Sequence, residues 1–295
     1  MDTELTIGTQ HFCIQSGIVR VLSLQNQFID EILDPETTLR EIKQQSVRAD
    51  LLTFLQLPPA TSPKFPYHLQ WDNLAVLEIS SYENWFTKQI HQNPRNKVRK
   101  AEKIGVTVQV ETFSDRLAAG LVELFNETPT RRGRRYAYFG WDLEMVKHGW
   151  ATELDRSLFL VAYYREELIG FIKLTFGQRL ARTSGTIAKQ AHKDKAPMNA
   201  LFAKAVEVCA ARGVPLLVYG KYSYRNNGED SLMVFKKYNG FRRIDVPRYY
   251  VPLSTRGRIG LALGLHRSAS DLIPGPVLRL LLNLRSRWQQ ATEKN

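Results

Sequence analysis

The sequence is poor in cysteine and has no long apolar run. Its 295 residues include two cysteines, Cys13 and Cys209, which lack the spacing of metal ligands and imply no disulfide framework. No run approaches the roughly 18 consecutive apolar residues of a membrane-spanning helix. The acidic residues Asp2 and Glu4 are unlike the basic beginning of a signal peptide. We therefore expect a cytoplasmic protein without a transmembrane segment.

Several catalytic patterns are missing as well. The sequence contains no Ser/His/Asp order, no cluster of metal ligands, no Walker loop and no dinucleotide-binding fingerprint. These absences argue against a triad hydrolase, a P-loop nucleotide hydrolase and a nicotinamide or flavin enzyme. We expect no metal cofactor.

Basic residues, by contrast, are in excess. Lysine and arginine together number 41 against 29 aspartates and glutamates, which gives a formal net charge of +12. Such a balance favours an anionic partner, for example nucleic acid, a phosphorylated carrier or an acidic lipid surface, without selecting one of them. Hydrophobic residues make up 43% of the chain, enough for a packed core.

The stretch from 157 to 240 has the clearest strand and helix patterning. Three strand-like runs lead into a basic loop, a helix closed by Gly213 and a further buried strand, at residues 158–164, 168–176, 181–190, 191–197, 198–212 and 215–220. This order predicts an α+β fold, a mixed sheet with flanking helices. The amides of the loop and of the helix N-terminus would face one place, which suits the phosphates or backbone of an acyl donor.

We expect three parts along the chain, 1–92, 93–255 and 256–295. The first is a small α/β part with one long amphipathic helix at 35–57, whose inward positions would be Leu39, Ile42, Val47, Leu51, Leu52 and Leu55. In the last part, 256–295, basic and apolar residues alternate. Residues 256–290 would either lie on an anionic membrane surface or dock as a helix on the protein's own core.

Short motifs in a fixed order point to a known family. The run from Arg95 to Val106, which reads Arg-x-x-x-Arg-Lys-Ala-Glu-Lys-x-Gly-Val, comes first. A turn at 127–136 and the segment 232–241, with its Phe-Lys and later Gly, follow in order. This series resembles the Fem family of peptidoglycan-bridge aminoacyltransferases and their relatives in bacterial glycan gene clusters. The resemblance covers about half the chain, from 93 to 253. It consists of short spaced motifs whose order is more specific than any one of them.

The resemblance implies a GNAT acyltransferase fold, often present in two tandem copies, with a shortened GNAT-like part at the N-terminus here. It also implies a donor, either aminoacyl-tRNA or, as in more distant relatives, acetyl-CoA or another acyl-CoA. The loop after residue 188 lacks the Gly-x-Gly pattern of an ordinary CoA-binding member. Both donors therefore remain open.

Donor-binding candidates lie in and next to this loop, where positive charge and backbone amides would meet an anionic donor. They are Lys189, Gln190, His192, Lys193, Lys195 and Asn199. His192 also has the side-chain chemistry of a general base. Each lysine alone equally fits an exposed surface charge.

Catalytic candidates follow the last strand of the stretch. Tyr222 and Tyr224 come directly after it, where a phenol could protonate the leaving group, although aromatic packing explains them equally well. Lys236 matches a lysine that lies near the reaction centre in the Fem relatives, which implies a cation that stabilises developing negative charge. Asp230, beside Glu229, would orient an amine or cap the following helix.

Acceptor-binding candidates form a basic and aromatic cluster in the turn at 127–136. Arginine forks fit phosphate oxygens and aromatic rings fit sugar faces or bases, which points to Arg131, Arg132, Arg134, Arg135 and Tyr136. A solvated turn beside core aromatic residues is the other interpretation.

The sequence and the resemblance together predict an acyltransferase that modifies an amine on a cell-envelope or exopolysaccharide glycan precursor. Its partners would be a glycan or lipid-linked acceptor, tRNA if that is the donor, and the inner face of the membrane. The competing hypothesis is a non-catalytic GNAT scaffold that binds nucleic acid or another anionic partner.

Overall fold

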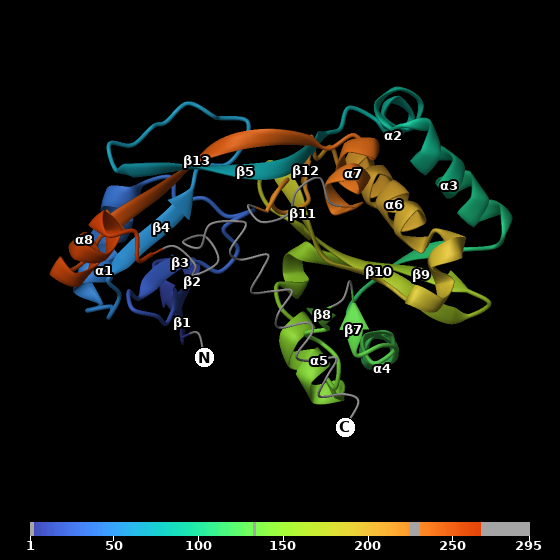
Figure 1. The fold of residues 1–295 in the computed structure, drawn as a ribbon, viewed down its shortest axis with the longest axis horizontal. Coiled ribbons are helices and arrows are strands. Elements are labelled where there is room, and N and C mark those ends of the chain that lie inside the picture. The colour runs from blue at the N-terminus through green and yellow to red at the C-terminus, as the bar shows by residue number, and fades with distance from the viewer. Residues whose placement is uncertain (1–2, 132–133, 225–230, 267–295) are drawn as a thin grey trace, which may run out of the picture. The chain divides into compact units, whose positions relative to one another are not determined.

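A computed structural model describes residues 3–131, 134–224 and 231–266 (Figure 1). The described residues form two compact units. Unit 1 contains residues 3–73, 223–224, 231 and 244–266, and unit 2 contains residues 74–131, 134–222 and 232–243. The division falls within two strands, β5 (His68–Glu78) and β13 (Arg242–Pro252). Residues 74–92, assigned from the sequence to the N-terminal part, therefore belong to unit 2.

Unit 2 is built on a mixed sheet. Its strands lie in the order β5, β12, β11, β10, β9, β6, all antiparallel to their neighbours except the parallel pair β11 and β12. The strand bounds are Thr107–Glu111 for β6, Ser157–Tyr164 for β9, Glu167–Phe176 for β10, Leu180–Ala188 for β11 and Leu216–Val218 for β12. A separate short hairpin pairs β7 (Thr130–Arg131) with β8 (Arg134–Arg135).

Helices cover both faces of this sheet. Helices α3 (Gln92–Lys103) and α6 (Pro197–Ala211) pack on one face, and α4 (Asp115–Phe125) and α5 (Leu143–Trp150) on the other (Figure 1). Strands β9 and β10 are apolar on both sides because both faces are covered, and β10 is buried from Leu168 to Thr175. The remaining helical elements are α2 (Tyr82–Asn84), the π-helical turn Trp85–Gln89, the 3₁₀ turns Leu154–Arg156 and Gln190–Lys195, and α7 (Ser231–Tyr238).

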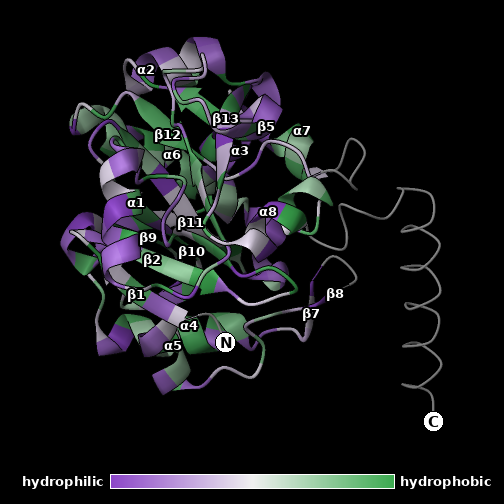
Figure 2. Cartoon of the chain, turned by 90° about the vertical axis from the view of Figure 1, so that its left-hand side faces the viewer, coloured by the Kyte–Doolittle hydropathy of each residue, from purple (hydrophilic) through white to green (hydrophobic). Residues whose placement is uncertain are grey.

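Unit 1 has its own small sheet. The strands β1 (Thr3–Ile7), β2 (Gln10–Gln15), β3 (Val21–Leu24), β4 (Leu51–Leu55) and β13 lie in that order, with α1 (Pro35–Gln44) between β3 and β4 and α8 (Thr255–Ala262) after β13. Only β3 and β4 are parallel. Helix α1 is mainly hydrophilic in Figure 2, in keeping with a narrow buried stripe of Pro35, Thr38 and Ile42.

The two units repeat one topology. In unit 1 the antiparallel strands β1, β2 and β3 are followed by α1 and then by β4, parallel to β3. In unit 2 the antiparallel strands β9, β10 and β11 are followed by α6 and then by β12, parallel to β11. The copy in unit 1 is smaller, with a helix of 10 residues against 15. The predicted α+β class, with a shortened N-terminal copy, is confirmed.

The prediction of one long helix at 35–57 was wrong. Helix α1 ends at Gln44, and Ser46 has a positive φ of 51° that a continuing helix does not allow. Residues Leu51–Leu55 form β4 instead, buried at every position between β3 and β13. A short apolar run of this kind fits a buried strand and a helix face equally well, and here strand pairing decides.

Candidate active site

The parallel strands β11 and β12 pair over a short length and then part. Their register pairs Leu180 with Leu216 and ends with Arg182 opposite Val218. Strand β11 continues to Ala188 with no further partner on β12. The backbone N–H and C=O groups at the end of β11 therefore make no hydrogen bonds to β12. A ligand can form hydrogen bonds with them along this edge.

A β-bulge redirects the end of β11, which has no partner on β12 but remains paired with β10. The pairing of β10 with β11 shifts register between Phe171, opposite Ile187, and Lys173, opposite Ser184. Gly185 lies in the bulge with a φ of +59°. A Cβ atom there would meet the Trp150 ring at 2.4 Å, so only glycine fits.

Lys236 lies where the two strands part. Its side chain, 1% exposed, projects from α7 and its ammonium donates a hydrogen bond to the carbonyl of Lys221. The same Nζ lies 4.8 Å from the centre of the Tyr219 ring, and the Tyr219 hydroxyl lies 3.0 Å from Thr186 Oγ1 on β11. The buried cation, the tyrosine and the bulged strand therefore form one connected group.

Sequence reasoning missed Tyr219 and Thr186. Both belong to predicted strands and were treated as strand residues. Their position at the ends of two strands joined by a helix crossover was the available signal, because such strands are parallel and their carboxyl ends lie at one edge.

The loop after β11 is held by an ion pair and by a hydrogen bond to the same carboxylate, that of Glu167. Lys189 Nζ lies 2.7 Å from one oxygen of Glu167, and His192 Nε2 lies 3.0 Å from the other. The hydrogen bond from Lys189 is the main cause of a lowered pKa for Glu167. Lys195 Nζ lies 5.1 Å from the Tyr164 ring centre and 3.3 Å from Asp194. Lys193 is exposed.

Glu127 occupies the first amides of this loop. Its carboxylate accepts hydrogen bonds from the backbone N–H groups of Gln190, at 2.8 Å, and Ala191, at 2.9 Å. It also pairs with Arg131 at 3.1 Å, and Arg131 donates to the carbonyl of Ala188 at 2.7 Å. Arg131, expected to bind the acceptor, thus contacts the base of the loop.

The first turn of α6 contains no carboxylate that would compete with an anionic ligand for its backbone N–H groups. Its N-cap residue, Ala196, is in the left-handed region and provides no side-chain cap, and the first turn has no acidic residue. Asn199 lies in this turn with 6% exposure. A helix N-terminus without a capping side chain retains its attraction for an anion.

The remaining predicted residues are spread more widely. Tyr136 is half-buried, with the Arg131 guanidinium 4.5 Å from its ring centre, and burial raises its pKa. Arg135 is exposed on β8. Tyr222 is half-buried against the core of unit 2, whereas Tyr224 is 48% exposed and belongs to unit 1. Arg132 and Asp230 lie outside the described residues, as does the whole tail from 267 onward.

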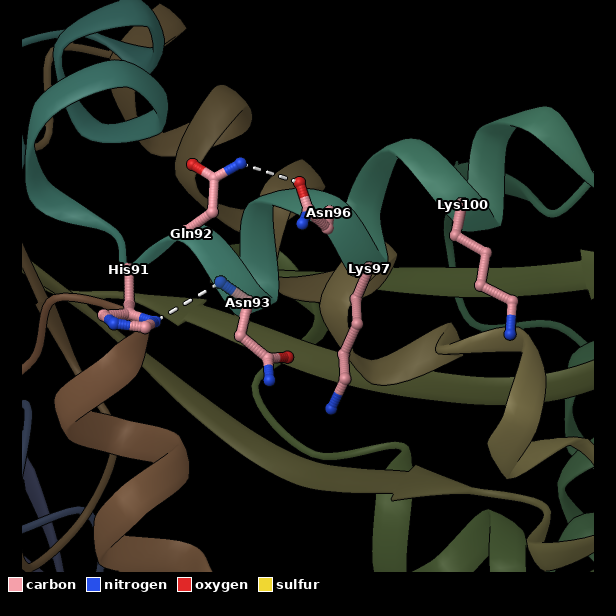
Figure 3. A pocket seen from close by; sticks show the side chains of 6 residues that line it. All are labelled: His91, Gln92, Asn93, Asn96, Lys97 and Lys100. Atoms are coloured by element: carbon pink, nitrogen blue, oxygen red, sulfur yellow. Dashed lines mark hydrogen bonds between the residues drawn. The ribbon is translucent and has the colours of Figure 1, made fainter.

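Helix α3 has a basic face on one side. Asn93, Lys97 and Lys100 follow a spacing of four and three residues and point to the same side of the helix (Figure 3). They line an open pocket of about 440 Å³ together with His91, Gln92 and Asn96. Helix α3 contacts the 3₁₀ turn Gln190–Lys195, so this pocket lies beside the loop after β11, residues 189–197, which is the predicted donor loop.

The described residues contain neither a membrane-spanning helix nor a cluster of metal ligands. None of the helices in the described ranges is long and apolar enough to cross a bilayer. Within residues 3–131, 134–224 and 231–266, no three His, Cys, Asp or Glu side chains are grouped to hold a metal ion.

No family model and no curated protein matches this sequence. Solved structures do resemble it. The C-terminal domain of a protein described as a lysylphosphatidylglycerol synthetase, from Agrobacterium fabrum, gives a TM-score of 0.59 at 12% identity, covering 88% of this chain and 87% of that one. L-PGS from Bacillus licheniformis gives 0.56 at 14% identity, with coverage of 89% and 88%. FemX gives 0.51 at 10% identity, with coverage of 84% and 87%.

These likenesses define the class of fold. At such low identity they show architecture alone, and the architecture is the GNAT-like acyltransferase fold. The parting parallel strands, the bulge and the uncapped helix after the loop are this chain's version of its central region.

Proposed function

We propose that this protein is a GNAT-like acyltransferase that moves an acyl group to an amine. The observation that carries the proposal is the group formed by the unpaired end of β11, the end of β12 and the buried Lys236, within a fold shared with the structures named above. The donor lies with its anionic part at the N-terminus of α6 and its acyl carbonyl against β11.

The chain's own residues supply three effects. The backbone edge of β11 that has no partner on β12 positions the donor, as a neighbouring strand would be positioned. The Lys236 ammonium stabilises negative charge that develops on the carbonyl oxygen, because a buried cation acts in a low dielectric. Tyr222, next to Lys221, supplies the proton that the leaving thiolate or ribose oxygen takes up. The amine loses one proton to solvent, its nitrogen bonds to the carbonyl carbon, and the bond from that carbon to the leaving group breaks. The Tyr222 phenolate then takes one proton back from solvent, so the protons balance.

Two classes of donor fit the proposal. One is acetyl-CoA or another acyl-CoA, and the other is aminoacyl-tRNA. The donor loop contains Lys189, Gln190, His192, Lys193 and Lys195, and in the structure the first three are bonded to Glu127 or Glu167. The exposed basic face of α3 beside this loop suits a long polyanion. The acceptor that we propose is an amine on a cell-envelope or exopolysaccharide glycan precursor, free or lipid-linked.

We place the protein in the cytoplasm, at the inner face of the membrane through residues 256–290. Within the described part of this segment, Ile259 is 55% and Leu263 is 65% exposed on one side of α8, with Arg256 and Arg258 also exposed. Exposed apolar and basic side chains together suit an anionic lipid surface.

A donor-binding experiment tests the proposal first. The true donor raises the unfolding midpoint, because only a ligand of the folded state stabilises it. We expect a shift with acetyl-CoA or with aminoacyl-tRNA. If neither changes the midpoint at concentrations up to the millimolar range, the acyltransferase proposal fails.

A transfer assay tests Lys236. With the donor so identified and a panel of amino sugars, Lys236→Met is expected to lower the rate roughly a hundredfold, the loss usual for one group that stabilises an oxyanion. Lys103→Met, at the exposed end of α3, removes the same charge and serves as the control. Equal rates for both variants would remove Lys236 from the mechanism.

The second candidate is a scaffold that binds nucleic acid without catalysis. The basic face of α3, with Lys97 and Lys100, favours it. Charge reversal at both lysines would then abolish binding to RNA, while Lys236→Met would leave it unchanged.

A further inference from the structure

Unit 2 contains a second pocket, on the side of α7 where Lys237 rather than Lys236 projects. Its volume is about 460 Å³, within the range of small-molecule sites. Residues from β5, the π-helical turn, the segment after β12, α7 and β13 line it: Glu78, Lys88, Gln89, Tyr222, Lys237, Gly240, Phe241, Arg242 and Arg243.

Positive charge dominates this pocket. Four basic residues line it, Lys88, Lys237, Arg242 and Arg243, with one acidic residue, Glu78. Among the described residues, Lys88, Lys237 and Arg242 take part in no ion pair. In the donor loop, by contrast, Lys189 and Lys195 each have a carboxylate partner. Like charges that line one pocket repel one another, and a bound anion reduces that repulsion.

The floor of the pocket is rigid. Phe241 is 2% exposed, and the neighbouring Asn239 carbonyl accepts a hydrogen bond of 3.0 Å from the buried Trp85 indole. Gly240 has a φ of +86°, and a Cβ atom there would lie 3.2 Å from Leu77 and 3.4 Å from the Gln89 carbonyl. The turn between Lys237 on α7 and Arg242 on β13 is thereby packed on both sides, so the backbone that positions the two cations needs little rearrangement to bind a ligand.

We propose that this pocket binds the phosphate group of the acceptor, as a diphosphate ester or a phosphodiester. Arginine forks such as that of Arg242 match phosphate oxygens, and the lysines add point charges. Tyr222 lines the same pocket and is the proposed proton donor, so a phosphate held here keeps the acceptor next to the reaction centre. The identification of the ligand as the acceptor rests on the proposed function, and the binding of phosphate does not.

An NMR titration of the full chain tests the pocket. Sodium pyrophosphate represents the diphosphate and dimethyl phosphate the diester, both in a phosphate-free buffer of low ionic strength. We expect amide shifts at residues 88–89, 222 and 237–243. The double variant Lys237→Gln/Arg242→Gln should weaken binding at least tenfold, since it removes two charge-assisted contacts. The control Lys103→Gln/Arg179→Gln removes two exposed charges elsewhere in unit 2 and should change the affinity less than twofold.

The vesicle arm identifies the source of the phosphate. If the group belongs to a lipid, sedimentation with vesicles of one part phosphatidylglycerol to three parts phosphatidylcholine falls in the double variant and not in the control. If it belongs to a soluble precursor, vesicle binding is equal in both while pyrophosphate binding differs. Either result agrees with the proposal. Lys88→Gln, a single change at an exposed side chain, replaces the double variant should the latter fail to fold.

Two results would overturn the proposal that this pocket binds phosphate. One is a set of shifts confined to residues 189–199, and the other is equal affinity in the pocket and control variants. Acyl transfer that persists in either case would leave the proposed function standing. Phosphate binding in the pocket without any donor binding would support the pocket and count against the proposed function.

Discussion

Gly185→Ala should destabilise the protein because of a specific steric clash. A Cβ atom at this position would lie 2.4 Å and 2.5 Å from two ring atoms of Trp150 and 2.8 Å from Phe171. Both rings are buried, with exposures of 6% and 0%. Overpacking of this kind costs about 1–3 kcal/mol. The left-handed φ of +59° adds about 1–2 kcal/mol for a residue with a side chain. The total is about 3 kcal/mol.

Gly213→Ala is a matched control for the backbone cost. Gly213 has a φ of +66°, and nothing lies within 4 Å of its ideal Cβ position. It ends α6, where it permits the reversal that closes the helix. Its replacement should therefore cost about 1 kcal/mol. Urea denaturation followed by tryptophan fluorescence measures both variants, and the difference between them isolates the clash.

A double variant identifies Trp150 as the cause. Trp150→Phe removes the two ring atoms nearest to the new methyl group. Its indole N–H has no hydrogen-bond partner among the described residues, so the change sacrifices packing alone. We expect Gly185→Ala to cost less in the Trp150→Phe background, with a coupling of about 1 kcal/mol or more. Equal destabilisation by Gly185→Ala and Gly213→Ala, or strict additivity with Trp150→Phe, would refute the steric argument.

Three further predictions concern groups outside the strand ends. Glu127→Gln should speed hydrogen exchange of the loop amides about tenfold, as expected for a weakened hydrogen bond to a charged acceptor. The Asp50 carboxyl, bonded to Arg20, has its pKa lowered from 3.8 to about 2. Its contribution of about 2 kcal/mol is present above pH 4 and is lost as the pH falls toward 2; Asp50→Asn should flatten acid denaturation in that window. Burial raises the pKa of Cys209 to about 12, so a thiol reagent should label the native protein only at Cys13.

Each of these has a contrary outcome. Unchanged exchange at the two loop amides would mean that Glu127 does not hold them. Identical acid denaturation profiles for the wild type and Asp50→Asn would show that the ion pair contributes nothing. Two equivalents of label on the native chain would show that Cys209 is accessible.

The sequence predicted the strands of unit 2 well because their patterning is local. The expected runs 158–164 and 168–176 agree with β9 and β10, and the helix at 198–212 agrees with α6 to within a residue or two. The apolar content of these segments is set by burial on both sheet faces, so it is visible without knowledge of their partners. At 51–55 the same kind of run was read as helix, since its strand pairing involves residues far along the chain.

The site depends on such distant partners even more. Glu127 and Gln190 are separated by 63 positions, and Thr186 and Tyr219 by 33. No spacing rule joins residues so far apart, because their proximity comes from the crossover of α6 and from the hairpin turn after α4. Lys236 could be singled out from a motif alone, but its burial at the end of β12 could not.

The repeated topology has one further consequence. In unit 1 the helix that follows the antiparallel strands begins with Asp34, whose side chain accepts the N–H of Thr37, and has Glu36 in its first turn. In unit 2 the corresponding helix begins with neither a cap nor an acid. The two copies thus differ at the same position of their shared topology. The N-terminus of α1 is occupied by its own carboxylates and would repel a phosphate, whereas the N-terminus of α6 can attract one. The first turn of each helix therefore indicates which of the two units can bind an anion at that position.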